Sequence, residues 1–285
     1  MQLTDTGHQL FGIMAPNLEK ETAAWLSGKL EAMIRDRSAR DLYLTYTLLA
    51  TKVSQGQNVH FPGSDEALEN YLKTHRTSLL EIARMYVLSS VLDADKDYFL
   101  PKVAQLIQVA DTGELKTFLR YLFILPHAGE FRQVAVEALR TNIATIFDAI
   151  ALDNPYPAKY FTEAQWNQMY LKAAFMQRDL DGILEVDRRA NKDLARIISD
   201  YAHERWAASR DVDPMFWRPV SSFIGDELLP DMKRLLESDN PRENMAGALC
   251  CFYSGQKKAL ELLQAYPELS EMVHKGKVRW NNLKE

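Results

Sequence analysis

Apolar side chains recur every three or four residues along most of this chain, and this spacing decides which secondary structure the chain can form. The spacing is clearest over residues 130–151, where nine apolar residues follow it. Residues spaced in this way share one face of an α-helix. The composition agrees, because 37 Leu and 30 Ala, which favour helices, stand against 13 Val, which favours strands. The sequence therefore predicts an all-α protein with few or no strands.

Turn signals cut the periodic pattern into helices of roughly 10–20 residues, which is an ordinary length for globular proteins. Breaks of this kind include the polar stretch 55–65 and Asn154-Pro155-Tyr156-Pro157. Short helices with short connections favour stacked antiparallel helix pairs, an α-solenoid of the HEAT-like type, and an irregular helical domain is the alternative. We expect a flexible N-terminal arm over 1–16, a single helical domain over 17–275 and a C-terminal tail over 276–285.

The charge balance argues against a nucleic-acid partner. The chain carries 34 Lys and Arg against 39 Asp and Glu, for a net charge of −5. Binding to a phosphate backbone requires clustered cations, and the one basic run is His274-Lys275-Gly276-Lys277-Val278-Arg279 in the tail. We interpret this run as a solubilising tail. Peripheral membrane contact through residues 274–285 is the alternative.

Cysteine usage and hydropathy predict a reduced, cytoplasmic protein. The two cysteines, Cys250 and Cys251, are adjacent, and a bridge between neighbours strains the intervening peptide. The first 16 residues lack the basic start and apolar core of a signal peptide. Charged residues interrupt every apolar stretch before it reaches the ~20 residues that span a bilayer. We therefore expect no transmembrane segment.

Complete catalytic and metal-binding motifs are absent from the sequence. It has no glycine-rich phosphate loop, no G-x-S-x-G turn and no C-x-x-C pair. His203-Glu204 begins an H-E-x-x-H pattern, but Ala207 stands where the second histidine would be. We therefore expect no cofactor and no metal, and the sequence identifies no catalytic residue.

Polar residues within apolar helix faces are the most informative feature for function. Asn142 shares a predicted stripe with Leu139 and Ile146, while Asn167 and Lys172 lie in a segment that is apolar nearly all round. A buried amide or ammonium requires a partner, since an unpaired one costs about 1–3 kcal/mol or more.

Two interpretations of these residues stay open. One is an internal network of ion pairs and amides that fixes helix register, with Asp200 and Glu204 as counter-ions. The other is a pocket for an anionic, partly apolar small molecule. Its candidate residues are the polar side chains and the aromatic residues around them, namely Arg140, Asn142, Tyr156, Trp166, Asn167, Lys172, His203, Glu204, Arg205 and Trp206.

Several blocks of the chain resemble the EboA domain family. They are Arg140-Thr141-Asn142-Ile143, Asn154-Pro155-Tyr156-Pro157, Trp166-Asn167-Gln168-Met169-Tyr170-Leu171-Lys172, Asp187-Arg188-Arg189-Ala190-Asn191 and Tyr201-Ala202-His203-Glu204-Arg205-Trp206-Ala207. The resemblance covers about residues 20–265 and makes the helical region a single EboA-type domain. Proteins of this family are encoded beside a prenyltransferase and other small-molecule enzymes. The resemblance therefore implies a role in making or exporting a small metabolite, and it assigns no reaction.

Three functional hypotheses follow. The first is a non-enzymatic helical binding or scaffold protein, whose partner is an anionic or prenylated metabolite, pathway proteins, or both. The second is an enzyme acting on a small anionic substrate, with Lys172 as a desolvated base or nucleophile and His203 and Glu204 as acid and base. A membrane adaptor that uses the basic tail is a third, and the absence of a complete catalytic constellation favours the first.

Overall fold

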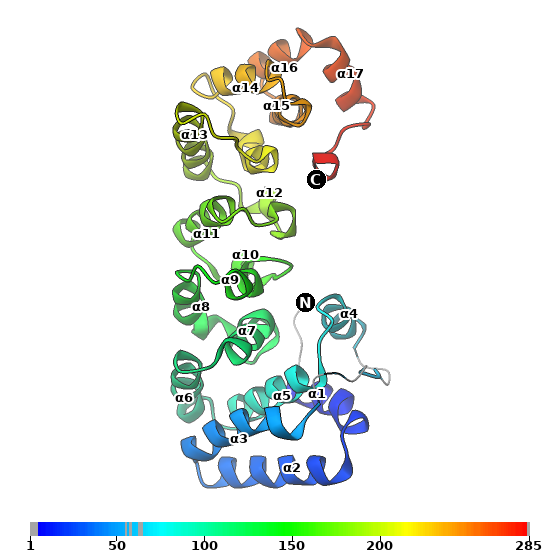
Figure 1. Cartoon of the computed structure of the whole chain (residues 1–285), viewed down its shortest axis with the longest axis vertical. Helices are drawn as coiled ribbons and strands as arrows, with labels where there is room; N and C mark the ends of the chain where they lie inside the picture. The colour runs from blue at the N-terminus through cyan, green and yellow to red at the C-terminus, as the bar shows by residue number, and fades with distance from the viewer. Residues whose placement is uncertain (1–4, 55, 57–58, 62–64, 284–285) are drawn as a thin grey trace. The chain divides into compact units, whose positions relative to one another are not determined.

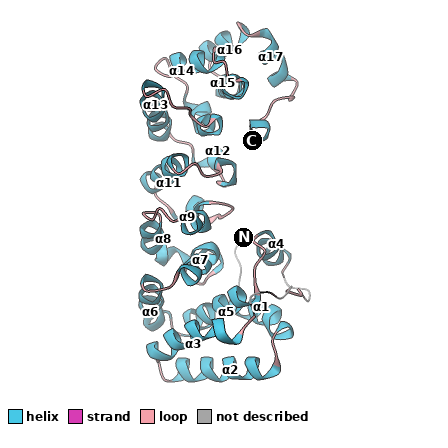
Figure 2. Cartoon of the chain, in the orientation of Figure 1, coloured by secondary structure: helices cyan, strands magenta, loops and turns pink. Residues whose placement is uncertain are grey.

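The computed structural model describes residues 5–54, 56, 59–61 and 65–283, and helices dominate throughout (Figure 1). Within those residues there is no β-strand, as Figure 2 shows, so the predicted all-α class is confirmed. The stacking of helices in HEAT-like pairs stays a prediction. Six positions of the predicted polar stretch 55–65 lie outside the described residues, namely 55, 57, 58, 62, 63 and 64. The chain forms two compact units, Met1–Ile150 and Ala151–Glu285.

The first unit surrounds one central helix. Its helices are α1 (Thr6–Met14), α2 (Lys20–Arg35), α3 (Ala39–Lys52), α4 (Glu66–Thr74), α5 (Leu79–Ala94), α6 (Lys96–Gln108), α7 (Thr112–Tyr121), α8 (Arg132–Ala138) and α9 (Ala144–Ala151). Helix α5 packs against α1, α2, α3, α6 and α7 and is buried on most sides. A capping box fixes its start: the Ser78 hydroxyl accepts from the Glu81 N–H, and the Glu81 carboxylate accepts from the Ser78 N–H.

The predicted N-terminal arm is wrong for residues 5–16. Residues 6–14 form α1, which packs along α5 and buries Leu10, Ile13 and Met14. Asp5 caps the helix by accepting from the His8 N–H at 3.3 Å. Leu10 and Ile13 have the three-residue apolar spacing of a helix, but this segment is too short for the spacing alone to predict one.

The single helix expected over 130–151 is broken in two. Residues 139–143 separate α8 from α9, and the Thr141 hydroxyl accepts a hydrogen bond from the Ile143 N–H at 3.0 Å. A threonine side chain that bonds to the nearby backbone competes with the helical hydrogen-bond pattern. Apolar spacing alone does not predict this interruption, because apolar residues continue at intervals of three and four on both sides of it.

The second unit likewise contains one largely buried helix, α15 (Pro241–Ser254). Its helices are α10 (Tyr156–Tyr160), α11 (Glu163–Phe175), α12 (Val186–Arg189), α13 (Lys192–Ala207), the 3-10 helix η5 (Pro214–Phe223), α14 (Leu229–Leu236), α15 (Pro241–Ser254), α16 (Lys257–Gln264) and α17 (Pro267–His274). Helix α15 packs against η5, α14, α16 and α17. A Cβ atom on Gly247 would lie 2.9 Å from Leu235 Cβ, so this glycine allows α14 to approach α15 closely.

Both cysteines lie buried inside α15, and neither forms a disulfide. Burial raises the pKa of both thiols, that of Cys251 to about 12. The C-terminal tail is more ordered than expected, because the 3-10 helix η6 (Trp280–Leu283) buries Trp280 and Leu283. Residues 280–283 pack against α15 and η5, so the segment after the basic run is held against the second unit.

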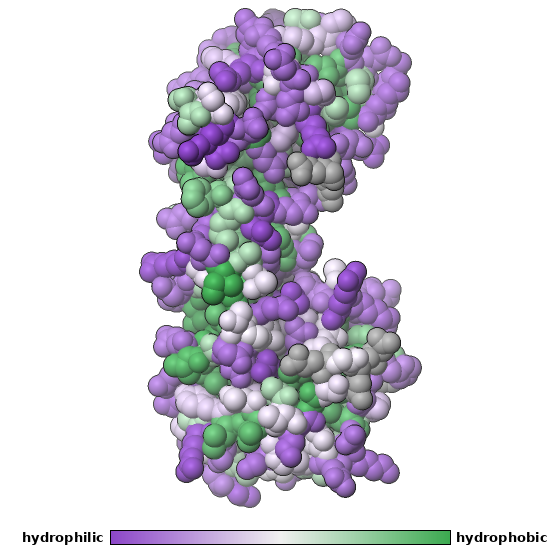
Figure 3. All heavy atoms as spheres, viewed as in Figure 1, coloured by the Kyte–Doolittle hydropathy of each residue, from purple (hydrophilic) through white to green (hydrophobic). Residues whose placement is uncertain are grey.

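On the face drawn in Figure 3, hydrophobic residues reach the surface in small groups among hydrophilic ones. Among the described residues, no helix combines the length and apolar character that a membrane crossing requires.

Candidate functional site: an apolar groove in the first unit

Two of the predicted pocket residues, Arg140 and Asn142, belong to the first unit, and both are exposed. The prediction that Asn142 is a buried amide is wrong, because the chain leaves the helix before it reaches this residue. Arg140 does not point into an apolar core either. Its Nη1 lies 3.1 Å from Oε2 of Glu137, and the guanidinium is 73% exposed. The other eight candidates belong to the second unit.

In the second unit, the amide of Asn167 has a structural role. Asn167 on α11 and Asn191, the N-cap of α13, exchange two hydrogen bonds at 2.9 and 3.1 Å. Asn191 also accepts from the Leu194 N–H, which caps α13. The arrangement joins two helices and satisfies the buried amide. The internal network that the sequence left open is therefore present at this position.

An arginine that sequence reasoning missed completes this network. The Arg189 guanidinium donates to the Ala158 carbonyl at 2.8 Å and to the Phe161 carbonyl at 2.9 Å. The same group lies 5.0 Å from the ring centroid of buried Trp166. These carbonyls belong to the end of α10, so Arg189 caps that helix. Tyr156, also buried, packs against the neighbouring aromatic rings Tyr160 and Phe161.

Lys172 lies in the last turn of α11 and is half-buried. Desolvation lowers the pKa of its ammonium group. This direction agrees with the predicted environment, although the side chain is not enclosed.

His203 is held by a carboxylate that sequence reasoning missed. Its Nε2–H donates to Oδ1 of Asp231 at 2.6 Å, and the Ser199 hydroxyl donates to Oδ2 at 2.6 Å. The Asp231 side chain is 4% exposed, whereas that of His203 is 59% exposed. Asp231 shares an i, i+4 stripe with Leu235, so the same criterion that selected Asn142 would have selected it.

The order of these three residues excludes one familiar chemistry. In a serine-hydrolase triad the histidine lies between the acid and the serine and takes the serine proton. Here the aspartate lies between the two, so His203 does not contact the Ser199 hydroxyl as a base. The cluster orients an exposed histidine and joins α13 to α14.

The remaining predicted residues lie near the end of α13, where Glu204 is exposed and Arg205 and Trp206 are half-buried. The Arg205 guanidinium donates to the Asp211 carbonyl at 2.8 Å. The Trp206 ring stacks on Trp217 at a centroid separation of 5.6 Å, and the Arg234 guanidinium lies 4.4 Å from the Trp206 centroid. The contacts of Arg205 and Trp206 are therefore with neighbouring protein groups.

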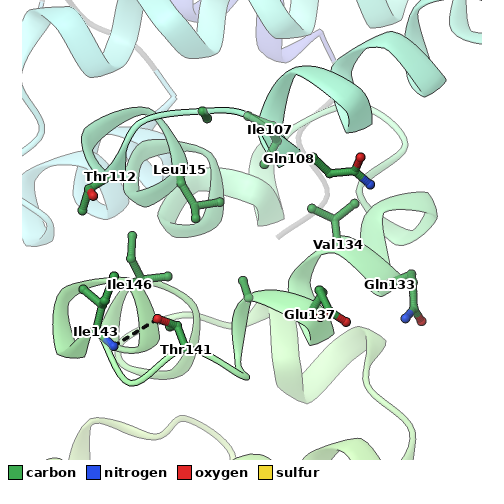
Figure 4. A pocket seen from close by; sticks show the side chains of 12 residues that line it. Ile107, Gln108, Thr112, Leu115, Gln133, Val134, Glu137, Thr141, Ile143 and Ile146 are labelled. Carbon is green, nitrogen blue, oxygen red and sulfur yellow. Dashed lines mark hydrogen bonds between the residues drawn. The ribbon is translucent and has the colours of Figure 1, made fainter.

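An apolar groove of about 660 Å³ lies in the first unit, among the end of α6, the start of α7, and helices α8 and α9. Figure 4 shows Leu115 of α7 and Ile146 of α9 facing each other across it. Its size is that of a small-molecule site. The lining residues are Ile107, Gln108, Ala110, Thr112, Leu115, Gln133, Val134, Glu137, Ala138, Thr141, Ile143 and Ile146.

A buried ion pair holds the α7 wall of the groove in place. Glu114 on α7 accepts from the Arg84 guanidinium of α5 at 3.4 Å, and both residues are buried. The Arg84 guanidinium also lies 5.4 Å from the ring centroid of Tyr46 on α3. Glu114 forms a capping box with Asp111 at the start of α7. The wall is therefore fixed to the core of the unit.

Uncharged polar groups line the groove beside its apolar surface. In the part of the chain that the structure describes, the side chains of Gln108, Thr112 and Gln133 form no hydrogen bond with protein groups. Their amides and hydroxyl are open to a ligand or to solvent. Sequence reasoning missed the groove because its residues come from four helices and the connections between them, and most of them are ordinary in their local sequence.

Comparison with known proteins gives one match. A model of the family described as "Metabolite traffic protein EboA" matches residues 7–221. No curated protein and no solved structure matches the chain. Within the described residues, no group of three or more His, Cys, Asp or Glu side chains is placed to hold a metal ion.

Proposed function

Because this chain belongs to the EboA family of metabolite traffic proteins, we propose that it is a non-enzymatic protein that binds a small metabolite in the groove formed by α6, α7, α8 and α9. The protein would act in the cytoplasm, in a pathway that makes or exports the metabolite. The metabolite is released unchanged, so its binding and release constitute the function.

The observation that carries this proposal is the groove itself. It has the volume of a small-molecule site, and most of its wall is aliphatic. The polar groups of Gln108, Thr112 and Gln133 can orient a ligand without reacting with it. Its α7 wall is fixed by the Arg84–Glu114 pair, and a fixed site loses less entropy when it binds.

An enzyme that uses Lys172 is the second candidate, and the lowered pKa of its ammonium favours it. A lysine with a lowered pKa is a better base or nucleophile near neutral pH. The buried Asp231 carboxylate orients His203, which is a second feature of acid–base sites. A turnover that disappears in Lys172→Met, with the fold retained, would select this candidate over the binding protein.

The groove is tested by placing a charge in its wall. Ile143 lines the groove and is 52% exposed, so Ile143→Asp puts a carboxylate against the ligand with little cost to folding. We expect the affinity for Nile red, an uncharged apolar dye, to fall about tenfold or more, because the ligand would have to desolvate the new charge. Fluorescence titration of the full chain measures this.

The matched control is Phe175→Asp, which adds the same charge at a side chain that is 70% exposed in the second unit. We expect its dye affinity to equal that of the unmodified protein. Equal losses in the two variants, or no dye binding at all, would refute the groove as the binding site.

A further inference from the structure

The charges around the groove define which ligands it accepts, and this inference rests on the proposed function. Among the twelve lining residues, Glu137 is the only one with a charged side chain. Its carboxylate oxygens lie 3.1 and 3.2 Å from Nη1 of Arg140, so the pair is neutral as a whole. None of these twelve residues is a lysine or an arginine. A bound phosphate or carboxylate would therefore have no free cation to pair with.

The start of α7, which forms one wall of the groove, is also unfavourable for a bound anion. Helix N-termini attract anions through free N–H groups and the helix dipole. At this helix, Oδ1 of Asp111 accepts from the Glu114 N–H at 2.8 Å, and the Glu114 carboxylate accepts from the Asp111 N–H at 3.2 Å. Two carboxylates thus already occupy the end of the helix. The nearby cation, Arg84, is paired with Glu114.

The groove lining also includes uncharged polar groups that can bind a neutral ligand. Gln108 and Gln133 carry amides that both donate and accept hydrogen bonds, and the Thr112 hydroxyl does the same. These groups suit a hydroxyl or carbonyl on the ligand. The apolar wall, which includes Leu115 and Ile146, suits a hydrocarbon body.

We propose that the groove binds an uncharged, mostly hydrocarbon molecule with a hydroxyl or carbonyl group, and that it discriminates against the anionic counterpart of that molecule. The anionic ligand expected from the sequence depended on Arg140, Lys172 and Arg205 facing one pocket. Arg140 pairs with Glu137 outside the apolar wall, and the groove has no cation in its place.

The experiment compares two ligands with the same chain, decan-1-ol and decanoate, as competitors of Nile red on the full protein at pH 8. A neutral alcohol enters any apolar site more readily than a carboxylate does. The decisive quantity is therefore the ratio of decanol affinity to decanoate affinity, compared between variants. Glu137→Gln removes the lining carboxylate and frees Arg140. We expect the ratio of alcohol to carboxylate affinity to fall about tenfold in this variant.

Arg140→Gln is the opposite change, since it leaves Glu137 unpaired beside the ligand. We expect the same ratio to rise several-fold above that of the unmodified protein. Phe175→Asp, which lies in the second unit, should leave the ratio as it is. Thermal denaturation of each variant confirms that the exposed substitutions leave the fold intact.

The outcomes separate this inference from the function on which it rests. If decanoate binds the unmodified protein as tightly as decanol, and Ile143→Asp weakens both, the groove is a binding site but the inference about charge is wrong. If the ratio does not respond to Glu137→Gln, the inference is also wrong. If neither ligand competes with the dye, or Ile143→Asp has no effect, the proposed function fails and the inference fails with it.

Discussion

The two units of this protein use their polar residues differently. In the second unit, two polar side chains of the sequence blocks that resemble the family join elements inside the protein: Asn167 bonds to Asn191, and Arg189 bonds to the end of α10. In the first unit, the polar groups of the groove, among them Gln108 and Gln133, are open to a ligand. Such blocks therefore include structural joints in the second unit, whereas most groove-lining residues of the first unit lie outside them, Thr141 and Ile143 excepted.

Charge burial shows the same contrast. The first unit buries a complete ion pair, Arg84 with Glu114, beneath the groove wall. The second unit buries the Asp231 carboxylate and pairs it with a histidine that is mostly exposed. A buried carboxylate with an exposed partner can still be stabilised by solvent near that partner. In a fully enclosed pair, removal of one member leaves the charge of the other without compensation.

The sharpest test of this contrast is Arg84→Ala, which would leave Glu114 buried without its cation. We expect a loss of about 3–5 kcal/mol in the free energy of unfolding, since an uncompensated buried charge is costly. Urea denaturation followed by circular dichroism measures the loss, and hydrogen exchange should locate it in α5 and α7. The double change Arg84→Met with Glu114→Leu should recover most of the stability. A single variant as stable as the unmodified protein would show that the pair is not important for the first unit.

A smaller effect distinguishes the two asparagines that the sequence marked. Asn167→Ala removes the two hydrogen bonds that join α11 to Asn191, and we expect a loss of about 1–3 kcal/mol. Asn142 is exposed, so Asn142→Ala should change stability by less than about 0.5 kcal/mol. The midpoints of urea unfolding compare the two directly. Equal effects would contradict the structural role assigned to Asn167.

A somewhat smaller change than that at Asn167 is expected at Gly247 in the second unit. Gly247→Ala would force its Cβ to within 2.9 Å of Leu235 Cβ, and overpacking of this kind costs about 1–3 kcal/mol. Alanine regains about 0.5–1 kcal/mol as a better helix former, so the net loss is up to about 2.5 kcal/mol. Gly12 in α1 has open space around it and is the matched control, where Ala should stabilise. A stabilised Gly247→Ala would mean that α14 and α15 do not pack as closely as described.

Local rules of helix formation explain how much of the fold could be predicted. Apolar spacing and the excess of Leu and Ala over Val gave the all-α class. Asp111 with Glu114 and Thr162 with Gln165 have the three-residue spacing of capping boxes, and the structure forms both. These signals act within a few residues, so no knowledge of the tertiary structure is required to recognise them.

What could not be predicted depends on contacts between distant residues. The burial of Asp231 depends on Ser199 and His203, which lie about thirty positions away, and the groove draws on four helices. The exposure of Asn142 follows from a hydrogen bond of Thr141, which interrupts a pattern that apolar spacing alone reads as continuous. The candidate site in the first unit was therefore outside the reach of sequence reasoning, apart from Arg140 beside it.

The break at residues 139–143 has a consequence for how this family could diversify. Ile143 and Thr141 line the groove, yet they belong to a short connection outside the buried core. Insertions or deletions are tolerated far better in such connections than in packed helices. Changes within these five residues could therefore alter the size of the groove while the surrounding helices stay the same. If the groove binds the metabolite as we propose, relatives with ligands of different size should differ first in the length of this connection.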